Sequence, residues 1–241
     1  MVEFAGAHVV VTGGTGALGR AVVGALRAAG AVCHIPNLVP HEIDTFPYAA
    51  DSDVRIIRGV ELTDETAVKQ FYQSVPQLWG SIHLAGGFAM APIAEISAAD
   101  FDAQFNKNAR SCFLCTQAAV AGIRARTEPG PGGAIGGRIV NVSARPALEP
   151  RTGAGMVAYA ASKAAVAALT QALAEELSAE QIWVNAVAPS ILDTPANRAA
   201  MPQAEFGRWV SPAAIAEVIA FLASPQNGAT RGAVLPVYGG S

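Results

Sequence analysis

Tyr159 and Lys163 are the residues whose types and spacing first indicate chemistry. They lie four positions apart in an Ala- and Leu-rich stretch with no glycine or proline before Pro189, which predicts a helix. At this spacing the phenol and the ammonium share one helical face, and a nearby positive charge lowers a phenol pKa that is ordinarily about 10. The pair therefore predicts a proton donor and acceptor, and a solvated surface pair is the alternative.

A glycine-rich turn near the N-terminus predicts a dinucleotide site. A β-branched run at 8–12 precedes it, a helical pattern starts at Arg20, and Gly14, Gly16 and Gly19 fit G-x-G-x-x-G. Such glycines permit a tight turn and let the backbone approach a pyrophosphate at a helix N-terminus. The residues expected to contact the cofactor here are Thr12, Gly13, Gly14, Thr15, Gly16, Ala17, Leu18 and Gly19.

The sequence leaves the choice between NAD and NADP open. About 20 positions beyond the glycines, a carboxylate selects the 2′-hydroxyl of the adenosine ribose and a basic residue selects a 2′-phosphate. Asn37 falls at this place. Its amide can hydrogen-bond a ribose, but it neither repels nor pairs with a phosphate. The Pro-rich and acidic segment 36–53 that follows is predicted to be a surface loop without chemistry.

Composition indicates one folded domain over residues 1–241. Apolar residues make up 51% and charged residues 15%, which favours a buried parallel sheet and large subunit contacts. A net charge of -3 makes no electrostatic case for nucleic acid or an anionic membrane. No uninterrupted apolar run reaches the length of about 18 residues that spans a bilayer.

The three cysteines are Cys33, Cys112 and Cys115, too few for a disulfide framework, and the cytoplasm is the expected location. The Cys-x-x-Cys pair lies inside a long helical pattern predicted at about 98–126, without a second ligand pair, so neither a redox nor a metal site is predicted. His83 lies within a predicted strand and is expected to be a core histidine.

The predicted fold class is α/β: a single Rossmann-type doubly wound parallel sheet of about seven strands, with helices on both faces. Expected strands are 8–12, 31–35, 54–58, 81–85, 138–143, 182–189 and 232–237, with helical patterns between most of them. The connection at about 190–210 is long enough to be a substrate loop or lid.

Taken together, these parts resemble the short-chain dehydrogenase/reductase family over nearly the whole chain. Thr12 to Gly19 is similar to its T-G-x-x-x-G-x-G turn, with Ala17 in place of the middle glycine, and 84–87 resembles N-N-A-G without the asparagines. Tyr159-x-x-x-Lys163 is similar to the active-site pair. Asn108 falls at the asparagine that holds a proton-relay water.

This resemblance implies hydride transfer between NAD or NADP and a small carbonyl or imine-type substrate, within a homodimer or homotetramer. Val187 to Ser190 with Thr194 resembles the P-G-x-x-x-T stretch at the nicotinamide carboxamide. The further cofactor contacts it implies are Asn37, Leu62, Ala85, Gly86, Gly87, Lys163, Pro189, Ile191 and Thr194. The substrate contacts it implies are Phe88, Ala144, Arg145 and Trp209.

One departure concerns the family's catalytic serine, whose column falls on Ala144. Ser143 is a candidate replacement if the longer loop at 144–155 shifts the local register. A missing hydroxyl costs ~2 to 4 kcal/mol if it acts like an oxyanion-hole donor. The dihydropteridine reductase branch works without this serine, and 85–88 and 192–198 resemble its segments, whereas Asn37 and Asn108 do not follow it.

Three functions therefore remain open: a general carbonyl or imine oxidoreductase, a quinonoid dihydropteridine reductase, and a non-catalytic dinucleotide-binding sensor or scaffold. A stripe of small residues after Lys163 is the expected subunit interface, and an intramolecular packing face is its alternative. These residues are Ala164, Ala165, Ala168 and Ala172.

Overall fold

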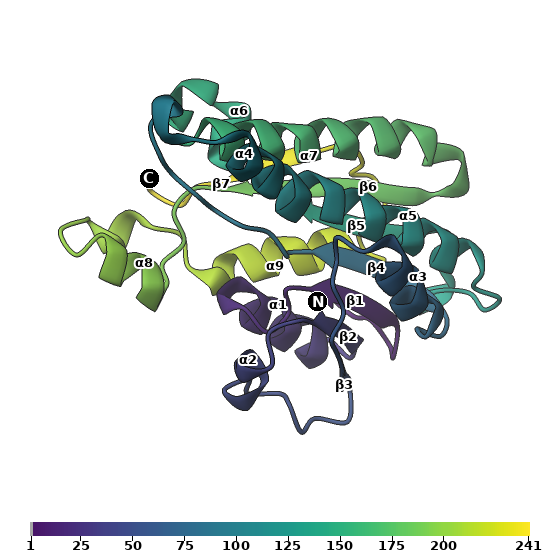
Figure 1. The fold of residues 1–241 in the computed structure, drawn as a ribbon. Coiled ribbons are helices and arrows are strands. Elements are labelled where there is room, and N and C mark those ends of the chain that lie inside the picture. The colour runs from purple at the N-terminus through teal and green to yellow at the C-terminus, as the bar shows by residue number, and fades with distance from the viewer. Residues whose placement is uncertain (1) are drawn as a thin grey trace.

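The computed structural model describes residues 2–241, and within that range the chain forms one parallel sheet of seven strands in the order β3-β2-β1-β4-β5-β6-β7 (Figure 1). Every neighbouring pair is parallel. The strands are β1 (His8–Thr12), β2 (Val32–Asn37), β3 (Val54–Arg58), β4 (Leu78–His83), β5 (Gly137–Val142), β6 (Ile182–Pro189) and β7 (Val234–Val237). The predicted fold class is confirmed.

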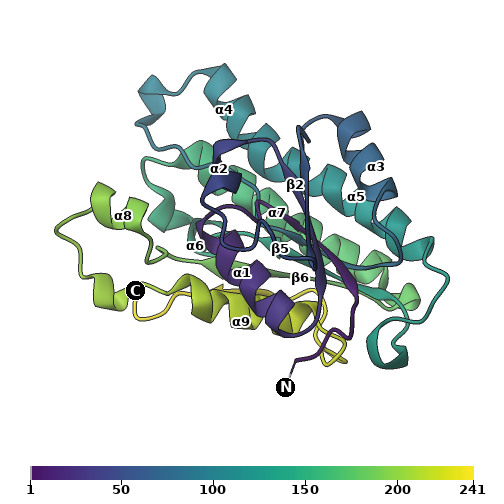
Figure 2. The same ribbon diagram turned by 90° about the horizontal axis from the view of Figure 1, so that it is seen from below.

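Helices cover both faces of the sheet. Helices α1 (Ala17–Ala28) and α9 (Pro212–Ala223) lie on one face, and α3 (Glu65–Gln73), α5 (Ser111–Arg124) and α7 (Val157–Glu176) lie on the other (Figures 1 and 2). Successive strand residues point to opposite faces. Accordingly, Val9 and Val11 belong to the core under α1 and α9, while Val10 belongs to the core under α3 and α5. Burial on both faces explains the continuous apolar runs.

The helical stretch predicted at about 98–126 is three elements in the structure. Helix α4 (Ala98–Phe105) is capped by Ser97, whose hydroxyl accepts from the Asp100 N–H in a capping box. A π-helical turn, η2 (Asn106–Arg110), separates α4 from α5. Such turns frequently mark functional positions.

Shorter elements lie in the connections. The segment 36–53, predicted to be a plain loop, contains the helical turn α2 (His41–Asp44). After β5 come α6 (Arg145–Leu148) and the 3₁₀ turn η4 (Pro150–Gly153). The other 3₁₀ turns are η1 (Ile93–Glu95), η3 (Pro131–Gly133), η5 (Ser178–Glu180) and η6 (Phe206–Arg208).

The connection after β6 closes on itself at its base. Leu192 and Val210 form an isolated parallel bridge, and the Asp193 N–H donates to the Val210 carbonyl at 2.9 Å. Between them lies α8 (Pro195–Ala200), which projects from the body of the molecule at the left of Figure 1. The predicted loop is therefore a folded projection with a fixed base.

Among residues 2–241, α7 is the helix long and apolar enough to cross a bilayer by length and composition, with a mean hydropathy of 1.2. It contains no uninterrupted apolar run of that length. It contacts β6, and its Lys163 is buried against the end of β5, so its composition fits a core helix.

Candidate active site

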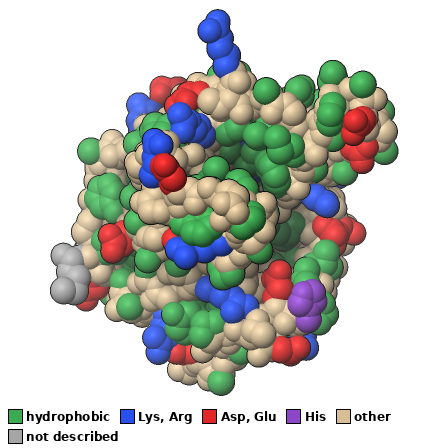
Figure 3. Space-filling view, turned by 90° about the vertical axis from the view of Figure 1, so that its left-hand side faces the viewer, with side chains coloured by type: hydrophobic (Ala, Val, Ile, Leu, Met, Phe, Trp, Pro, Cys, Tyr) green, Lys and Arg blue, Asp and Glu red, His purple; other side chains and the backbone are tan. Residues whose placement is uncertain are grey.

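The loops that follow β1, β4, β5 and β6 meet at one edge of the sheet because the carboxyl ends of parallel strands lie on the same side. In the view of this edge, hydrophobic side chains gather around a hollow near its centre (Figure 3). The glycine turn, the Asn108 turn and the helix of Tyr159 all reach this edge. Open α/β sheets bind their ligands at such a place.

The glycine turn has the geometry of a phosphate cradle. Gly13 has a φ of +65°, and a Cβ on it would lie 2.9 Å from the Ala85 nitrogen, so the turn requires glycine both for conformation and for space. The Ala85 N–H donates to Thr12 Oγ1 at 3.2 Å, which joins the ends of β1 and β4. Gly16 precedes the 12-residue α1, whose N-terminus can hold a phosphate. These residues fit a dinucleotide.

Lys163 is anchored to the end of β5. Its Nζ donates to the Val142 carbonyl at 2.9 Å, and burial lowers the pKa of its ammonium to about 8. Tyr159, one helical turn before it, is half-buried, and burial raises the pKa of its phenol to about 12. The sequence predicted that Lys163 lowers the Tyr159 pKa. Within the chain's own groups the Tyr159 pKa is raised instead, because burial disfavours the charged phenolate.

Asn108 holds the backbone that follows β4. Its Oδ1 accepts from the Gly87 N–H at 2.9 Å, and its Nδ2 donates to the Gly87 carbonyl and to Ser162 Oγ, both at 3.0 Å. A Cβ on Gly86 would lie 2.6 Å from Asn108 Oδ1 and 3.3 Å from Lys163 Nζ. The structure thus brings the predicted residues Gly86, Gly87, Asn108 and Lys163 together. The Asn108 amide is occupied in positioning the backbone.

Ser143 occupies a different place from the one a substrate donor needs. Its buried hydroxyl donates to the main-chain carbonyl of Lys163 at 2.9 Å. Ala144 is buried and precedes α6, with an extended backbone. In this structure the Ser143 hydroxyl links α7 to the end of β5, and its replacement of the family's serine stays a prediction.

Of the residues expected to contact substrate, Phe88 is the one held against Tyr159. The two rings meet edge to face with centroids 5.0 Å apart, and Phe88 is 62% exposed. Arg145 is engaged by an ion pair with Glu149 at 2.8 Å and by the Tyr238 ring at 4.8 Å.

Trp209 lies at the base of the loop after β6, where it packs on Phe206 with ring centroids 4.9 Å apart. Trp209 is half-buried, whereas Phe88 is exposed, so the two aromatic residues named from the sequence differ in the ring surface they offer to a substrate.

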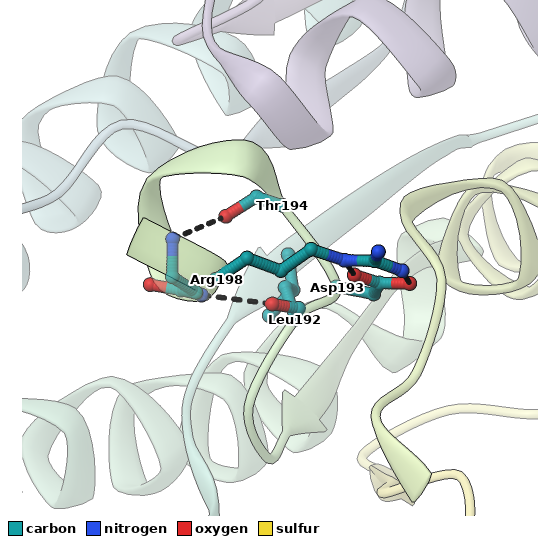
Figure 4. Close-up of polar contacts among 5 residues, drawn as sticks. Leu192, Asp193, Thr194 and Arg198 are labelled. Atoms are coloured by element: carbon teal, nitrogen blue, oxygen red, sulfur yellow. Dashed lines mark hydrogen bonds and ion pairs between the residues drawn. The ribbon is translucent and has the colours of Figure 1, made fainter. Parts of the chain in front are cut away.

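The residues expected at the nicotinamide end lie around the start of α8. Thr194 caps this helix, its Oγ1 accepting from the Asn197 N–H at 3.2 Å, so the hydroxyl keeps its own hydrogen to donate. The Asn197 amide donates to the Leu192 carbonyl, and Asp193 pairs with Arg198 (Figure 4). This arrangement holds the Thr194 hydroxyl in a defined place.

Three other residues named as cofactor contacts differ in exposure. Pro189 is buried at the end of β6, Ile191 is 37% exposed, and Leu62 is half-buried against the core.

Near Asn37, the residue expected at the adenosine ribose, lies a carboxylate that sequence reasoning missed: Glu42. Asn37 is buried at the end of β2, and its Nδ2 donates to Thr15 Oγ1 at 3.2 Å. The Thr15 hydroxyl in turn donates to the Glu42 carboxylate from α2. The only sequence signal was an acidic residue shortly after β2, in the segment to which no chemistry was assigned.

A cluster of buried polar side chains lies between β4, β5 and α5, behind the site. His83 Nδ1 lies 2.8 Å from Asn141 Oδ1, its Nε2 lies 2.8 Å from Ser81 Oγ, and burial lowers its pKa to about 4. The prediction of a core histidine is confirmed. Burial raises the pKa of the Cys112 and Cys115 thiols, so both residues pack as neutral groups.

The fold and this edge define a class of protein: a dinucleotide-binding α/β oxidoreductase with a tyrosine and a lysine on one helix. The family model described as enoyl-(acyl carrier protein) reductase matches residues 14–241. The chain belongs to the short-chain dehydrogenase/reductase family, and it is an NAD(P)-dependent oxidoreductase.

Individual proteins match along almost their whole length. L-Xylulose reductase from Mus musculus is 30% identical over 98% of this chain and 96% of the relative. A 3-oxoacyl-[acyl-carrier-protein] reductase from Thermotoga maritima is 29% identical over 96% of each. Among solved structures, a blue fluorescent protein from a metagenomic library in complex with NADPH superimposes with a TM-score of 0.83 at 29% identity, covering 98% of this chain and 97% of that one.

Proposed function

We propose that this oxidoreductase acts on a small carbonyl or imine-type substrate, with Tyr159 exchanging the proton. The observation that supports this most directly is the place of Tyr159, at the carboxyl edge of the sheet one helical turn from the anchored Lys163. A substrate held between Phe88 and the glycine turn would meet the phenol on its exposed side. Bound NAD or NADP supplies the hydride carrier, and its oxidised ring adds positive charge that favours a phenolate.

The residues of the chain divide the remaining work. Tyr159 gives a proton to the substrate oxygen or nitrogen during reduction and removes it during oxidation. Lys163 offers a donor at a fixed position, because the Val142 carbonyl accepts one of its three hydrogens and leaves two for a ribose hydroxyl or water. Asn108 acts as a positioning residue through Gly87. Both amide hydrogens of Asn108 are used by Gly87 and Ser162, so a water ordered by Asn108 would donate to one of its oxygen atoms.

The absence of a hydroxyl at Ala144 favours substrates whose reacting group is already polarised. A quinonoid dihydropterin is one such substrate, and its planar ring could stack on the exposed face of Phe88. The names of the similar proteins do not indicate this substrate, whereas L-xylulose reductase and 3-oxoacyl reductase name carbonyl compounds. The carbonyl function is therefore the first proposal, and the pterin function is the second.

The test is a steady-state assay of NADH and NADPH oxidation with three substrate sets: ketoses that include L-xylulose, β-ketoacyl thioesters, and quinonoid dihydropterin. Turnover that disappears in Tyr159→Phe, while calorimetry still detects cofactor binding, supports the proposal. Cofactor binding without turnover on any set would favour a sensor or scaffold.

The assembly predicted from the alanine stripe remains a proposal with new support. Ala164, Ala168 and Ala172 are exposed at successive turns of α7, so the alternative of an intramolecular packing face does not account for them. Small residues at this spacing allow another helix to approach closely. Sedimentation velocity decides between a homodimer or homotetramer and a monomer.

A further inference from the structure

A chain of hydrogen bonds brings a carboxylate to the adenosine end of the cofactor site. Asn37 donates to Thr15 in the glycine turn, and Thr15 donates to Glu42 in α2. A dinucleotide whose pyrophosphate lies on the glycine turn places its adenosine ribose at the end of the second strand. Glu42 reaches this place from a helical turn five residues beyond Asn37.

We propose that Glu42 binds the adenosine ribose and makes this site prefer NAD(H) over NADP(H), an inference that rests on the proposed function because it assigns the cofactor of the same site. The groups at this place are mainly acceptors. The Thr15 hydroxyl donates its one hydrogen to Glu42, and Asn37 Oδ1 is buried without a donor. A ribose 2′-hydroxyl supplies the missing donor. A 2′-phosphate dianion supplies further acceptors and a like charge, which is unfavourable beside a carboxylate.

Arg20 is a cation that contacts the segment of Glu42, donating to its main-chain carbonyl at 3.5 Å, and its guanidinium is already engaged. Its Nε donates to the Thr15 carbonyl at 2.9 Å, and its Nη1 and Nη2 donate to the Thr45 carbonyl and hydroxyl at 2.7 and 2.6 Å. These contacts tie the segment of α2 to the glycine turn, so Arg20 fixes Glu42 in place. Its Nε, Nη1 and Nη2 each already donate a hydrogen bond, so the guanidinium is not poised to bind a phosphate in a bidentate way.

Arg58 is the residue that could serve a 2′-phosphate instead. It is exposed on β3, in register with Asn37 on β2. It has no hydrogen bond to the Asn37–Thr15–Glu42 chain among the contacts of residues 2–241. The carboxylate is held at the ribose position by a direct bond to the glycine turn, whereas Arg58 would have to reach over, so the geometry favours Glu42 as the determinant.

The experiment measures NADH and NADPH binding by titration calorimetry, which does not depend on turnover. The unsubstituted chain should bind NADH at least tenfold more tightly than NADPH, and Glu42→Gln should reduce that ratio at least tenfold. Glu42→Asp keeps the charge and should keep the preference. Asp44→Asn removes an equal charge from an exposed position of the same helical turn and should change the ratio less than twofold.

Equal binding of both cofactors by the unsubstituted chain, or equal ratios in Glu42→Gln and Asp44→Asn, would overturn the assignment to Glu42. A selective loss of NADPH affinity in Arg58→Gln would overturn it as well, because it would place a phosphate at Arg58. If the unsubstituted chain binds neither cofactor, the proposed function itself fails. Thermal melting of each variant separates a folding defect from a binding defect, and Glu42→Asp tests the charge where Glu42→Gln is unstable.

Discussion

Replacement of Gly86 by alanine should damage the site through one identifiable contact. The added Cβ would lie 2.6 Å from Asn108 Oδ1, closer than side-chain carbons come to other heavy atoms, and 3.3 Å from Lys163 Nζ. One of these groups has to move. The contact with Lys163 at 3.3 Å is relieved by a slight shift, whereas the Asn108 oxygen at 2.6 Å is held by the bonds of its amide to Gly87 and Ser162, so most of the strain falls on the Asn108 bonds.

The size of the effect follows from those bonds. A hydrogen bond contributes about 0.5 to 1.5 kcal/mol net, and overpacking of a tight site costs about 1 to 3 kcal/mol. Partial loss of the three Asn108 bonds together with residual strain gives a destabilisation of about 2 to 4 kcal/mol for Gly86→Ala. For a chain of this length the melting temperature should fall by about 4 to 16 °C. Turnover should fall further, because Lys163 is displaced with Asn108.

The assay combines thermal melting, urea unfolding and steady-state rates. Gly228→Ala is the matched control, because a Cβ there would have no atom within 4 Å and the residue is not among the positive-φ glycines of residues 2–241. A double-mutant cycle with Asn108→Ala isolates the contact. In that background the oxygen is gone, and the cost of Gly86→Ala should fall by about 1 kcal/mol or more.

The outcome that refutes this reasoning is a Gly86→Ala protein as stable as Gly228→Ala. A penalty of the same size with and without the Asn108 side chain would also refute it. In either case the backbone after β4 is not held by the Asn108 amide.

Three further predictions follow from the same geometry. Tyr159→Phe should lower kcat about 10² to 10⁴-fold while cofactor affinity changes little; an unchanged kcat would remove Tyr159 from the proton transfer. His34 and His83 are buried, and their pKa values are lowered to about 4. As the pH falls, the unfolded chain therefore takes up protons at these histidines before the folded chain does. The free energy of unfolding should fall between about pH 6.5 and about pH 4, by an amount on the order of 1 to 3 kcal/mol for each histidine. Urea unfolding at pH 7 and pH 5 measures this loss, and His83→Gln should make it smaller. Ser143→Ala should cost about 1 kcal/mol of stability in urea unfolding, because the Lys163 carbonyl loses its donor, yet leave Tyr159 chemistry intact; a kcat loss as large as that of Tyr159→Phe would return Ser143 to the catalytic residues.

The fold could be predicted from the sequence because its determinants are local and periodic. β-branched runs such as 8–12 and 54–58 lie between helical patterns, and each became a strand with those bounds. The glycine turn was predictable for the same reason. The start of β4 was placed three residues late, at Ser81, because Leu78 and Trp79 give no strand periodicity, and only tertiary packing makes them core residues.

The details of the site could not be predicted because they depend on contacts between segments far apart in the sequence. Glu42 lies 27 positions from Thr15, and its role requires α2 to fold back over the glycine turn. The Ser143 hydroxyl lies near the predicted serine column, and its direction depends on how α7 packs against β5. The pKa values of Tyr159 and Lys163 are likewise set by burial, which spacing alone does not reveal.

Ser143, directly after β5, takes part in holding Lys163 at the end of that strand. The side chain of Lys163 donates to the carbonyl of Val142, the last residue of β5, and the main-chain carbonyl of Lys163 accepts from Ser143, the next residue, so both ends of this lysine are tied to adjacent residues. The family's serine column falls one position later, on Ala144, which has no hydroxyl. The hydroxyl of Ser143 binds the carbonyl of Lys163. These two bonds fix Lys163 one helical turn after Tyr159, and burial lowers the pKa of its ammonium to about 8. If Tyr159 exchanges the proton as proposed, polarisation of the substrate depends on Tyr159 and on the substrate itself, so we expect a substrate that is easily reduced.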